Sequence, residues 1–284
     1  MTASPRVSIG IPTYNRPEGL RRTLACMTRQ TYRNVEIIVS DNCSPGKETE
    51  RVVRDFTSSD DRVRYFVQET NRGAISNFKS VLDRSTGKYF MWVADDDAWD
   101  PEAVAAFVEC LENRPGCSVA MSACRRIYEA TGACETIDRF GTGFDLDVTA
   151  PIRLAWNACV NHYWTYLIYG MFHAPFLKQT FARLPEVFGS DVLFVCEVLL
   201  SSRIQYLAQP FYARTVSRLP TVDLYHGEKI AELYRDRGKY YKLALNAGRY
   251  LLKSKAIPGR RKWAVPFLMG RMALFAAQID LRKP

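Results

Sequence analysis

The chain has 284 residues, of which 47% are hydrophobic and 24% are charged. These proportions are ordinary for a globular protein, and the length suits one large domain or one domain with an appendage. No stretch of about 18 residues is apolar and uncharged enough to be predicted as a membrane span.

The charge is unevenly distributed along the chain. Residues 1–202 contain 22 Lys and Arg against 25 Asp and Glu, whereas residues 203–284 contain 17 against 5. The net charge of +9 therefore arises entirely in the C-terminal part, which indicates an anionic partner such as a membrane surface or a phosphorylated substrate. No nucleic-acid-binding motif or aromatic stacking platform accompanies the basic residues, so we expect no nucleic-acid partner.

Eight cysteines occur, none of them in a CxxC pair or at the spacing of a zinc site. The chain leads from Met1 into a strand without the pattern of a signal peptide. Both features predict a reducing, cytoplasmic location. Peripheral attachment to the inner face of the cell membrane is an alternative suggested by the basic C-terminal part.

Apolar runs alternate with helical patterns over the first 113 residues. We expect strands at 7–12, 35–40, 63–66 and 89–94, and helices at 17–30, 47–57, 74–83 and 101–112. This alternation is typical of βαβ units and predicts an α/β fold whose mostly parallel sheet is flanked by helices. The strands are almost continuously apolar, as expected for a sheet that is covered on both faces.

The second half has a less regular pattern. We expect short strands at 118–122, 126–128, 204–207 and 211–214, helices at 152–159, from 188 onward and from 223 to about 255, and an aromatic segment at 163–171. The last segment, Lys262 to Ile279, is an amphipathic helix with an Arg in the middle of its apolar run.

Three consecutive carboxylates, Asp95, Asp96 and Asp97, follow the apolar run that ends at Ala94. Because they repel one another, a packed fold keeps them together only beside a positive group. Oxygen ligands at the end of a buried strand suit Mg²⁺ or Mn²⁺, usually shared with substrate phosphates. The alternative is a solvated acidic turn, in which Asp100 caps the next helix and Pro101 opens it.

Polar residues also follow the first two strands, at Pro12-Thr13-Tyr14 and at Asp41-Asn42. In parallel α/β sheets, ligands bind outside the carboxyl ends of the strands, so we expect these residues and the acidic cluster to face one crevice. No GxGxxG or GxxxxGK[ST] motif occurs, which excludes the usual dinucleotide and P-loop phosphate sites.

Several stretches, in this order and spacing, resemble glycosyltransferase family 2, which has the GT-A fold. They are residues 7–16 (VSIGIPTYNR), 37–42 (IIVSDN), Asn71-Arg72-Gly73 with Asn77, and 94–97 (ADDD), followed more weakly by Phe188-Gly189-Ser190-Asp191. The resemblance covers residues 5–113 well. It implies a GT-A catalytic domain at 1–220, with a nucleotide-sugar half at 1–113 and an acceptor half at 114–220. A basic helical extension follows at 221–284.

The resemblance implies an inverting transfer of a sugar from a nucleotide-diphosphate donor, most often a UDP-sugar, to a hydroxyl of a glycan, a lipid-linked glycan or a natural product. It implies a donor site made of Pro12, Thr13, Tyr14, Asn15, Asp41, Arg72, Gly73, Asn77, Asp95 and Asp96. It also implies that Asp97 and Asp95 are ligands of Mn²⁺ or Mg²⁺. Such an ion would stabilise the departing diphosphate.

By the same resemblance, Asp191 would be the general base that takes the proton of the acceptor hydroxyl. The alternative is that Asp191 only caps its helix. His162, His173 and His226 are weaker candidates for a further metal ligand, since a lone His is more often structural.

Two other functions stay open at this stage. A nucleotidyltransferase on a similar sheet also uses paired carboxylates and metal, but would carry a Gly-rich, basic loop near its N-terminus, where Gly10 stands alone. A protein that binds nucleotide sugars without turnover is the other, and the intact Asp41, Asp95 and Asp97 argue against it.

The C-terminal segment 260–279 has two interpretations. Arg260-Arg261-Lys262 and Trp263, followed by apolar residues, are typical of an amphipathic helix that lies on an anionic membrane. The alternative is a helix packed on the catalytic domain or on the partner of a homodimer.

Overall fold

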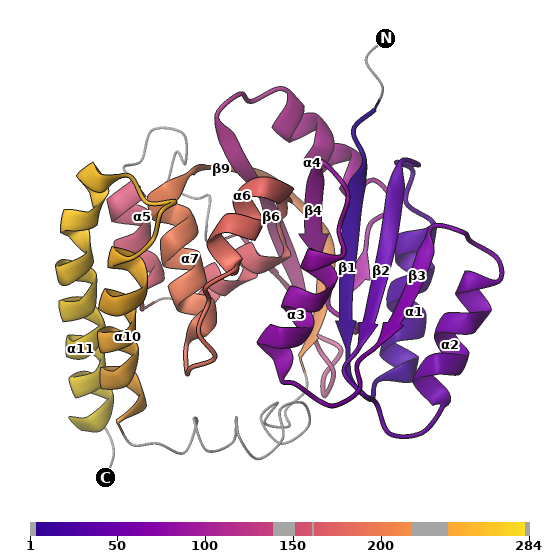
Figure 1. Cartoon of the computed structure of the whole chain (residues 1–284), viewed down its shortest axis with the longest axis horizontal. Helices are drawn as coiled ribbons and strands as arrows, with labels where there is room; N and C mark the ends of the chain where they lie inside the picture. The colour runs from indigo at the N-terminus through magenta and orange to yellow at the C-terminus, as the bar shows by residue number, and fades with distance from the viewer. Residues whose placement is uncertain (1–3, 139–150, 161, 217–237, 282–284) are drawn as a thin grey trace.

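The computed structural model describes residues 4–138, 151–160, 162–216 and 238–281. Figure 1 shows a central sheet with helices on both sides, and a pair of C-terminal helices at one edge of the molecule. The expected α/β fold with a helical C-terminal extension is confirmed.

The first half consists of regular βαβ units. Its elements are β1 (Val7–Thr13), α1 (Pro17–Thr28), β2 (Val35–Asp41), α2 (Glu48–Thr57), β3 (Val63–Val67), α3 (Ala74–Asp83), β4 (Tyr89–Trp92), β5 (Ala98–Trp99) and α4 (Ala103–Glu112). Strand β1 pairs in parallel with β2 and β4, and β2 pairs in parallel with β3. Every residue of β1 and β2 is buried, as the apolar runs predict.

The second half extends the same sheet in mixed orientation. Its elements are β6 (Cys117–Tyr128), β7 (Cys134–Ile137), α5 (Pro151–Ala158), the 3₁₀ helix η1 (His162–Tyr169), β8 (Met171–His173), α6 (Ala174–Phe181), α7 (Ser190–Ser201) and β9 (Arg203–Val216). The strand order is β3-β2-β1-β4-β8-β6-β9-β5, with β7 beside β6. The parallel part of the sheet is thus β3-β2-β1-β4 together with the β6–β9 pair, and β5, β7 and β8 pair antiparallel.

Three local expectations differ from the structure. The two strands expected at 204–207 and 211–214 form the single strand β9, whose register against β6 slips where Pro210 lies. A proline that cannot donate to the ladder is tolerated at such an irregularity. Helix α4 begins at Ala103 rather than Pro101, and the Asp100 carboxylate accepts a hydrogen bond from the Glu102 amide (2.9 Å). The strands expected at 118–122 and 126–128 likewise form the single strand β6. The aromatic segment, for which the sequence predicts no particular element, is mostly 3₁₀ helix.

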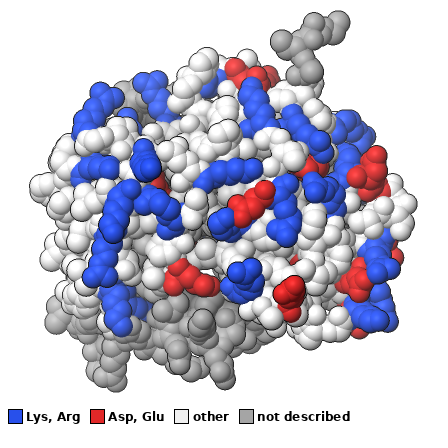
Figure 2. Space-filling model, viewed as in Figure 1, with Lys and Arg blue, Asp and Glu red and all other residues white. Residues whose placement is uncertain are grey.

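The C-terminal extension is a pair of packed helices, α10 (Lys239–Leu252) and α11 (Val265–Leu281), joined through the 3₁₀ helix η2 (Gly259–Ala264). The two helices approach closely because Gly248 leaves room for the Met269 side chain. The part of the expected helix before residue 238 lies outside the described residues. Figure 2 shows many Lys and Arg side chains on the side of the molecule formed by these helices.

A buried carboxylate joins the extension to the α/β part of the chain. Glu197 of α7 is fully buried and accepts a hydrogen bond from the Ser254 hydroxyl, which follows α10. The Tyr250 hydroxyl donates to the other carboxylate oxygen of Glu197 and also lies 2.9 Å from the carbonyl oxygen of Thr180. One face of the extension therefore packs on the α/β part of the chain.

We expect this contact to make stability depend on pH. Burial raises the pKa of Glu197, opposed by the hydrogen bonds from Ser254 and Tyr250. The stability that this group contributes is therefore complete below its unfolded pKa of about 4.3 and is lost as pH rises through the raised folded value. Glu197→Gln should accordingly become more favourable relative to wild type between pH 5 and pH 8, measured by urea unfolding. The exposed Glu109→Gln is the control, and a pH-independent difference for Glu197→Gln would contradict the expectation.

Candidate functional site

The acidic turn after β4 lies against helix α1. A Cβ atom on Gly19 would lie 2.5 Å from the carbonyl oxygen of Asp95, so only glycine allows this approach. The Thr23 hydroxyl lies 3.2 Å and 3.0 Å from the carbonyl oxygens of Ala94 and Asp97. Helix α1 thus fixes the backbone that carries the three carboxylates.

Arg16 supplies the positive charge that the acidic cluster requires. Its guanidinium donates to Asp95 Oδ1 (2.9 Å) and pairs with Asp96 Oδ2 (2.8 Å). The Thr13 hydroxyl donates to Asp95 Oδ2 (2.7 Å), so both carboxylate oxygens of Asp95 are engaged. Burial nevertheless raises the pKa of Asp95, against the effect of Arg16. Sequence analysis gave Arg16 no role, although it lies within the first matched stretch.

Unlike Asp95, Asp97 has no hydrogen-bond partner for its carboxylate oxygens among the described residues. Its side chain is 1% exposed. Burial raises its pKa to about 8, and Asp96 adds to this effect while Arg214 of β9 opposes it. A buried carboxylate without donors costs folding free energy, so its presence is a functional signal.

Asp41 is held rigidly at the end of β2. Its Oδ1 accepts from the amide and the hydroxyl of Ser44 (2.9 Å and 2.6 Å), and its Oδ2 accepts from the Tyr65 hydroxyl (2.8 Å). Thr13 pairs with Asp41 across β1 and β2, so the two strand ends meet. Through the Thr13–Asp95 hydrogen bond, the structure brings all three sequence-predicted clusters to one edge of the sheet.

The segment 71–73 is held by Asn42. The side-chain nitrogen Nδ2 of Asn42 donates to Asn71 Oδ1 (2.8 Å). The side-chain oxygen Oδ1 of Asn42 accepts from the backbone amide of Arg72 (2.9 Å). Gly73 has φ +83°, and a side chain there would collide with the Glu186 carboxylate. The loop that precedes α7 therefore lies beside the segment expected to bind the donor.

Four other predicted residues have distinct surroundings. Asn77 is buried, and its side-chain amide donates to the carbonyl oxygens of Thr13 (3.1 Å) and Ser40 (3.0 Å), so it positions the ends of β1 and β2. Asn15 is exposed with φ +53°, and its amide donates to the Ser44 hydroxyl (2.7 Å). Pro12 is buried in β1, and Tyr14 is half-buried.

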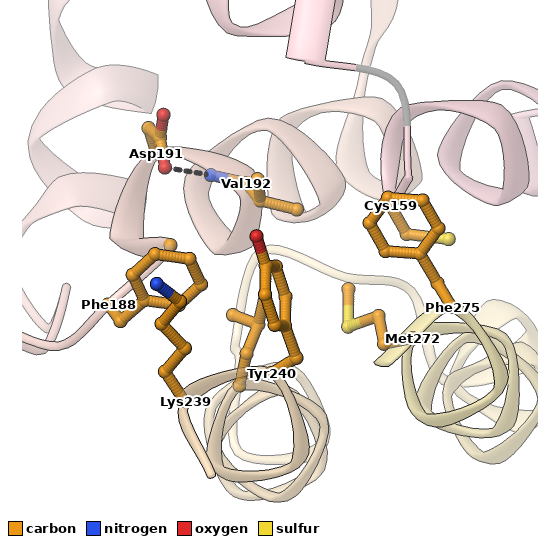
Figure 3. Close-up of a pocket in the computed structure, with 10 residues that line it drawn as sticks. Cys159, Phe188, Asp191, Val192, Lys239, Tyr240, Met272 and Phe275 are labelled. Atoms are coloured by element: carbon orange, nitrogen blue, oxygen red, sulfur yellow. Dashed lines mark hydrogen bonds between the residues drawn. The ribbon is translucent and has the colours of Figure 1, made fainter. Parts of the chain in front are cut away.

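Asp191 lies in the first turn of α7, after the N-cap residue Gly189. It is therefore not the N-cap, although its Oδ1 accepts a hydrogen bond from the Val192 amide (2.9 Å). Figure 3 shows it at one end of a cavity of about 330 Å³ between α7 and the C-terminal helices. The cavity is lined by Cys159, Phe188, Gly189, Asp191, Val192, Lys239, Tyr240, Leu243, Met272 and Phe275. Sequence analysis missed it because its walls come from segments far apart in the chain.

Among the histidine candidates, His173 can be placed, and it does not join the acidic turn. His173 pairs with Tyr89, at the end of β4 away from the acidic turn. The side chain of His162 and all of His226 lie outside the described residues. Within the part of the chain that the structure describes, no group of three or more His, Cys, Asp or Glu side chains could hold a metal ion.

The family model described as Glycosyl transferase family 2 matches residues 8–173, more than half of the chain. The chain belongs to glycosyltransferase family 2. This membership agrees with the motifs at the ends of β1, β2 and β4, and it does not favour the nucleotidyltransferase alternative.

Curated relatives are similar over part of their length. An uncharacterized protein y4gI of Sinorhizobium fredii is 25% identical over 74% of this chain and 22% of its own. A GalNAc(5)-diNAcBac-PP-undecaprenol beta-1,3-glucosyltransferase of Campylobacter jejuni is 34% identical over 33% of this chain and 30% of its own. The putative colanic acid biosynthesis glycosyl transferase WcaA of Escherichia coli is 31% identical over 38% of each. The chain thus spans well under half the length of these relatives.

Solved structures share the fold over nearly the whole chain. TarS 1–349 of S. aureus in complex with UDP-GlcNAc matches with a TM-score of 0.72 at 17% identity, covering 98% of this chain and 76% of that one. The mannosyltransferase PcManGT of Pyrobaculum calidifontis in complex with GDP-Man and Mn²⁺ matches with a TM-score of 0.57 at 16% identity, covering 100% and 77%. These likenesses show the GT-A fold.

We expect Gly19→Ala to damage the site although alanine favours helices. The added Cβ displaces the backbone of Asp95, which should lower the free energy of unfolding by roughly 1–3 kcal/mol and weaken nucleotide binding. Thermal unfolding and calorimetry with UDP measure both effects. Arg22→Ala, at an exposed position of the same helix, is the control. A stabilised Gly19→Ala variant would show that the close approach is not required.

Proposed function

We propose that the chain is a cytoplasmic, metal-dependent, inverting glycosyltransferase that moves a sugar from a nucleotide-diphosphate donor to an acceptor hydroxyl. The observation that carries this proposal is Asp97. Its two buried carboxylate oxygens have no hydrogen-bond partner among the described residues, at the strand ends where ligands of such sheets bind.

The residues present fit a divalent metal ion. Mg²⁺ and related ions are commonly bound through one or two carboxylates, with substrate phosphates and water completing the coordination. Asp97 supplies one such carboxylate, and an ion beside it would remove the cost of its burial. Asp95 has less support as a ligand, because Thr13 and Arg16 already occupy its oxygens. When bound, the ion would offset negative charge on the departing diphosphate.

The donor site would be formed by the residues at the ends of β1 and β2. Asp41 and Asn15 are fixed by Ser44, so their positions are set before a nucleotide binds. Asn42 fixes the backbone of Arg72, whose exposed side chain can reach a phosphate. A UDP-sugar is favoured because two TarS structures that share this fold contain UDP-GlcNAc or UDP.

The acceptor would bind beside Asp191. In a single displacement, the oxygen of the acceptor hydroxyl bonds to the anomeric carbon while the bond from that carbon to the diphosphate breaks. Asp191 takes the proton that the hydroxyl loses. The adjacent cavity would receive part of the acceptor. A glycan or a lipid-linked glycan suits this site, since one relative is named for an undecaprenol-linked acceptor and another for colanic acid biosynthesis.

Asp97→Asn tests the metal assignment directly. The substitution removes a buried ionisable group but no hydrogen bond to a described residue, so the unfolding midpoint without metal should equal or exceed that of wild type. Calorimetry with UDP and a panel of nucleotide sugars should show Mn²⁺-dependent binding of one donor to wild type and none to the variant. Asp100→Asn, which keeps the hydrogen bond to the Glu102 amide, is the control. Metal-dependent binding retained by Asp97→Asn would contradict the assignment.

Asp191→Asn separates catalysis from donor binding. Loss of a general base should lower the release of UDP from the selected donor by roughly 10²–10⁴-fold, while donor affinity stays unchanged. Unchanged turnover would remove Asp191 from the mechanism. If wild type and variant both bind the donor but neither releases UDP, the result would favour a non-catalytic protein.

A further inference from the structure

Large apolar side chains are exposed along one face of η2 and α11. Trp263, Phe267 and Leu274 are 60%, 61% and 68% exposed, and the rings of Trp263 and Phe267 lie 5.9 Å apart. Together with the exposed Pro266, Gly270 and Gln278, they follow the spacing of one helix face. The opposite face, with Val265, Leu268 and Met272, is buried in the protein.

Exposed apolar side chains are concentrated in this region. Among the described residues, the large exposed ones are Val67, Trp156, Tyr241, Leu245, Leu252, Trp263, Phe267 and Leu274. Six of these eight belong to α10, η2 and α11, and the guanidinium of Arg271 in α11 lies 4.7 Å from the ring of a seventh, Trp156. A concentration of this kind marks an interaction surface.

The charged residues of the C-terminal helices are predominantly basic. Residues 239–281 contain nine Lys and Arg and one Asp. Arg260, Arg261 and Lys262 lie at the N-terminal end of the apolar face, and Lys253 and Lys255 precede them in the connection from α10. Figure 2 shows Lys and Arg side chains on this side of the molecule. A basic rim around an apolar face with a Trp at its border complements the headgroups and acyl chains of anionic lipids.

We propose that the apolar face of α11, with its basic rim, binds the surface of a bilayer that contains anionic lipids. The helix would lie in the plane of the interface, and no helix among the described residues is long and apolar enough to cross a membrane. A second copy of the chain would bury the apolar face equally well, but it would bring its own basic rim into repulsion. The proposal goes beyond the glycosyltransferase assignment and does not depend on Asp97 or Asp191.

Co-sedimentation of the full chain with lipid vesicles tests the proposal. We expect binding to vesicles of mixed phosphatidylcholine and phosphatidylglycerol, little binding to phosphatidylcholine alone, and weakening by salt. Phe267→Ser with Leu274→Ser should reduce binding at least about tenfold. Val67→Ser, which removes an equally exposed apolar side chain outside the region, should change nothing. Arg260→Gln with Lys262→Gln should weaken binding about tenfold.

Two further measurements keep the outcome decisive. Calorimetry with UDP shows whether each variant is folded and whether the donor site works, so failure here is distinct from failure of the proposed function. Analytical ultracentrifugation measures the oligomeric state of wild type and of the Phe267→Ser, Leu274→Ser variant. Equal vesicle binding by wild type and this variant would overturn the proposal. The proposal would also be overturned if wild type forms a dimer that dissociates in the variant and does not bind anionic vesicles.

Discussion

Three adjacent carboxylates can share one strand end because two of them share one guanidinium. Arg16 pairs with Asp95 and Asp96, and helix α1 holds the turn that carries them. Asp97 accepts no hydrogen bond from the described residues, and its burial raises its pKa although Arg214 partly opposes this effect. Arg16 thus offsets the charge of Asp95 and Asp96. A bound cation would remove the folding free-energy cost of burying Asp97. The proposed donor chemistry depends on this division.

Elements of the second half of the chain surround the acidic turn and the expected donor site. Strand β9 brings Arg214 toward the acidic turn, and the loop before α7 lies beside Gly73. Glu197 joins α7 to the C-terminal helices, so the cavity beside Asp191 has walls from both. The same helices bear the apolar face with its basic rim. A lipid-linked acceptor would therefore suit the cavity and the proposed membrane surface together.

The sequence predicts the first half well because local patterns determine it. Apolar strands, helix spacing and the residues after each strand locate Thr13, Asp41 and the acidic turn at one sheet edge. It does not predict the partners that come from distant segments: Arg214 reaches the turn only through the pairing of β9, and the cavity exists only once α10 and α11 pack on α7. The aromatic segment 163–171 shows no clear helical or strand period, so the sequence predicts no element for the 3₁₀ helix that forms there.

A crystal structure with UDP and Mn²⁺, with the ion located by its anomalous scattering, would show directly whether Asp97 binds metal. We expect one Mn²⁺ peak at coordination distance, roughly 2.0–2.2 Å, from a carboxylate oxygen of Asp97 and shared with the diphosphate. Asp95 should keep its hydrogen bonds to Thr13 and Arg16. Bound UDP with Asp97 still unliganded, or an ion held elsewhere, would contradict this expectation.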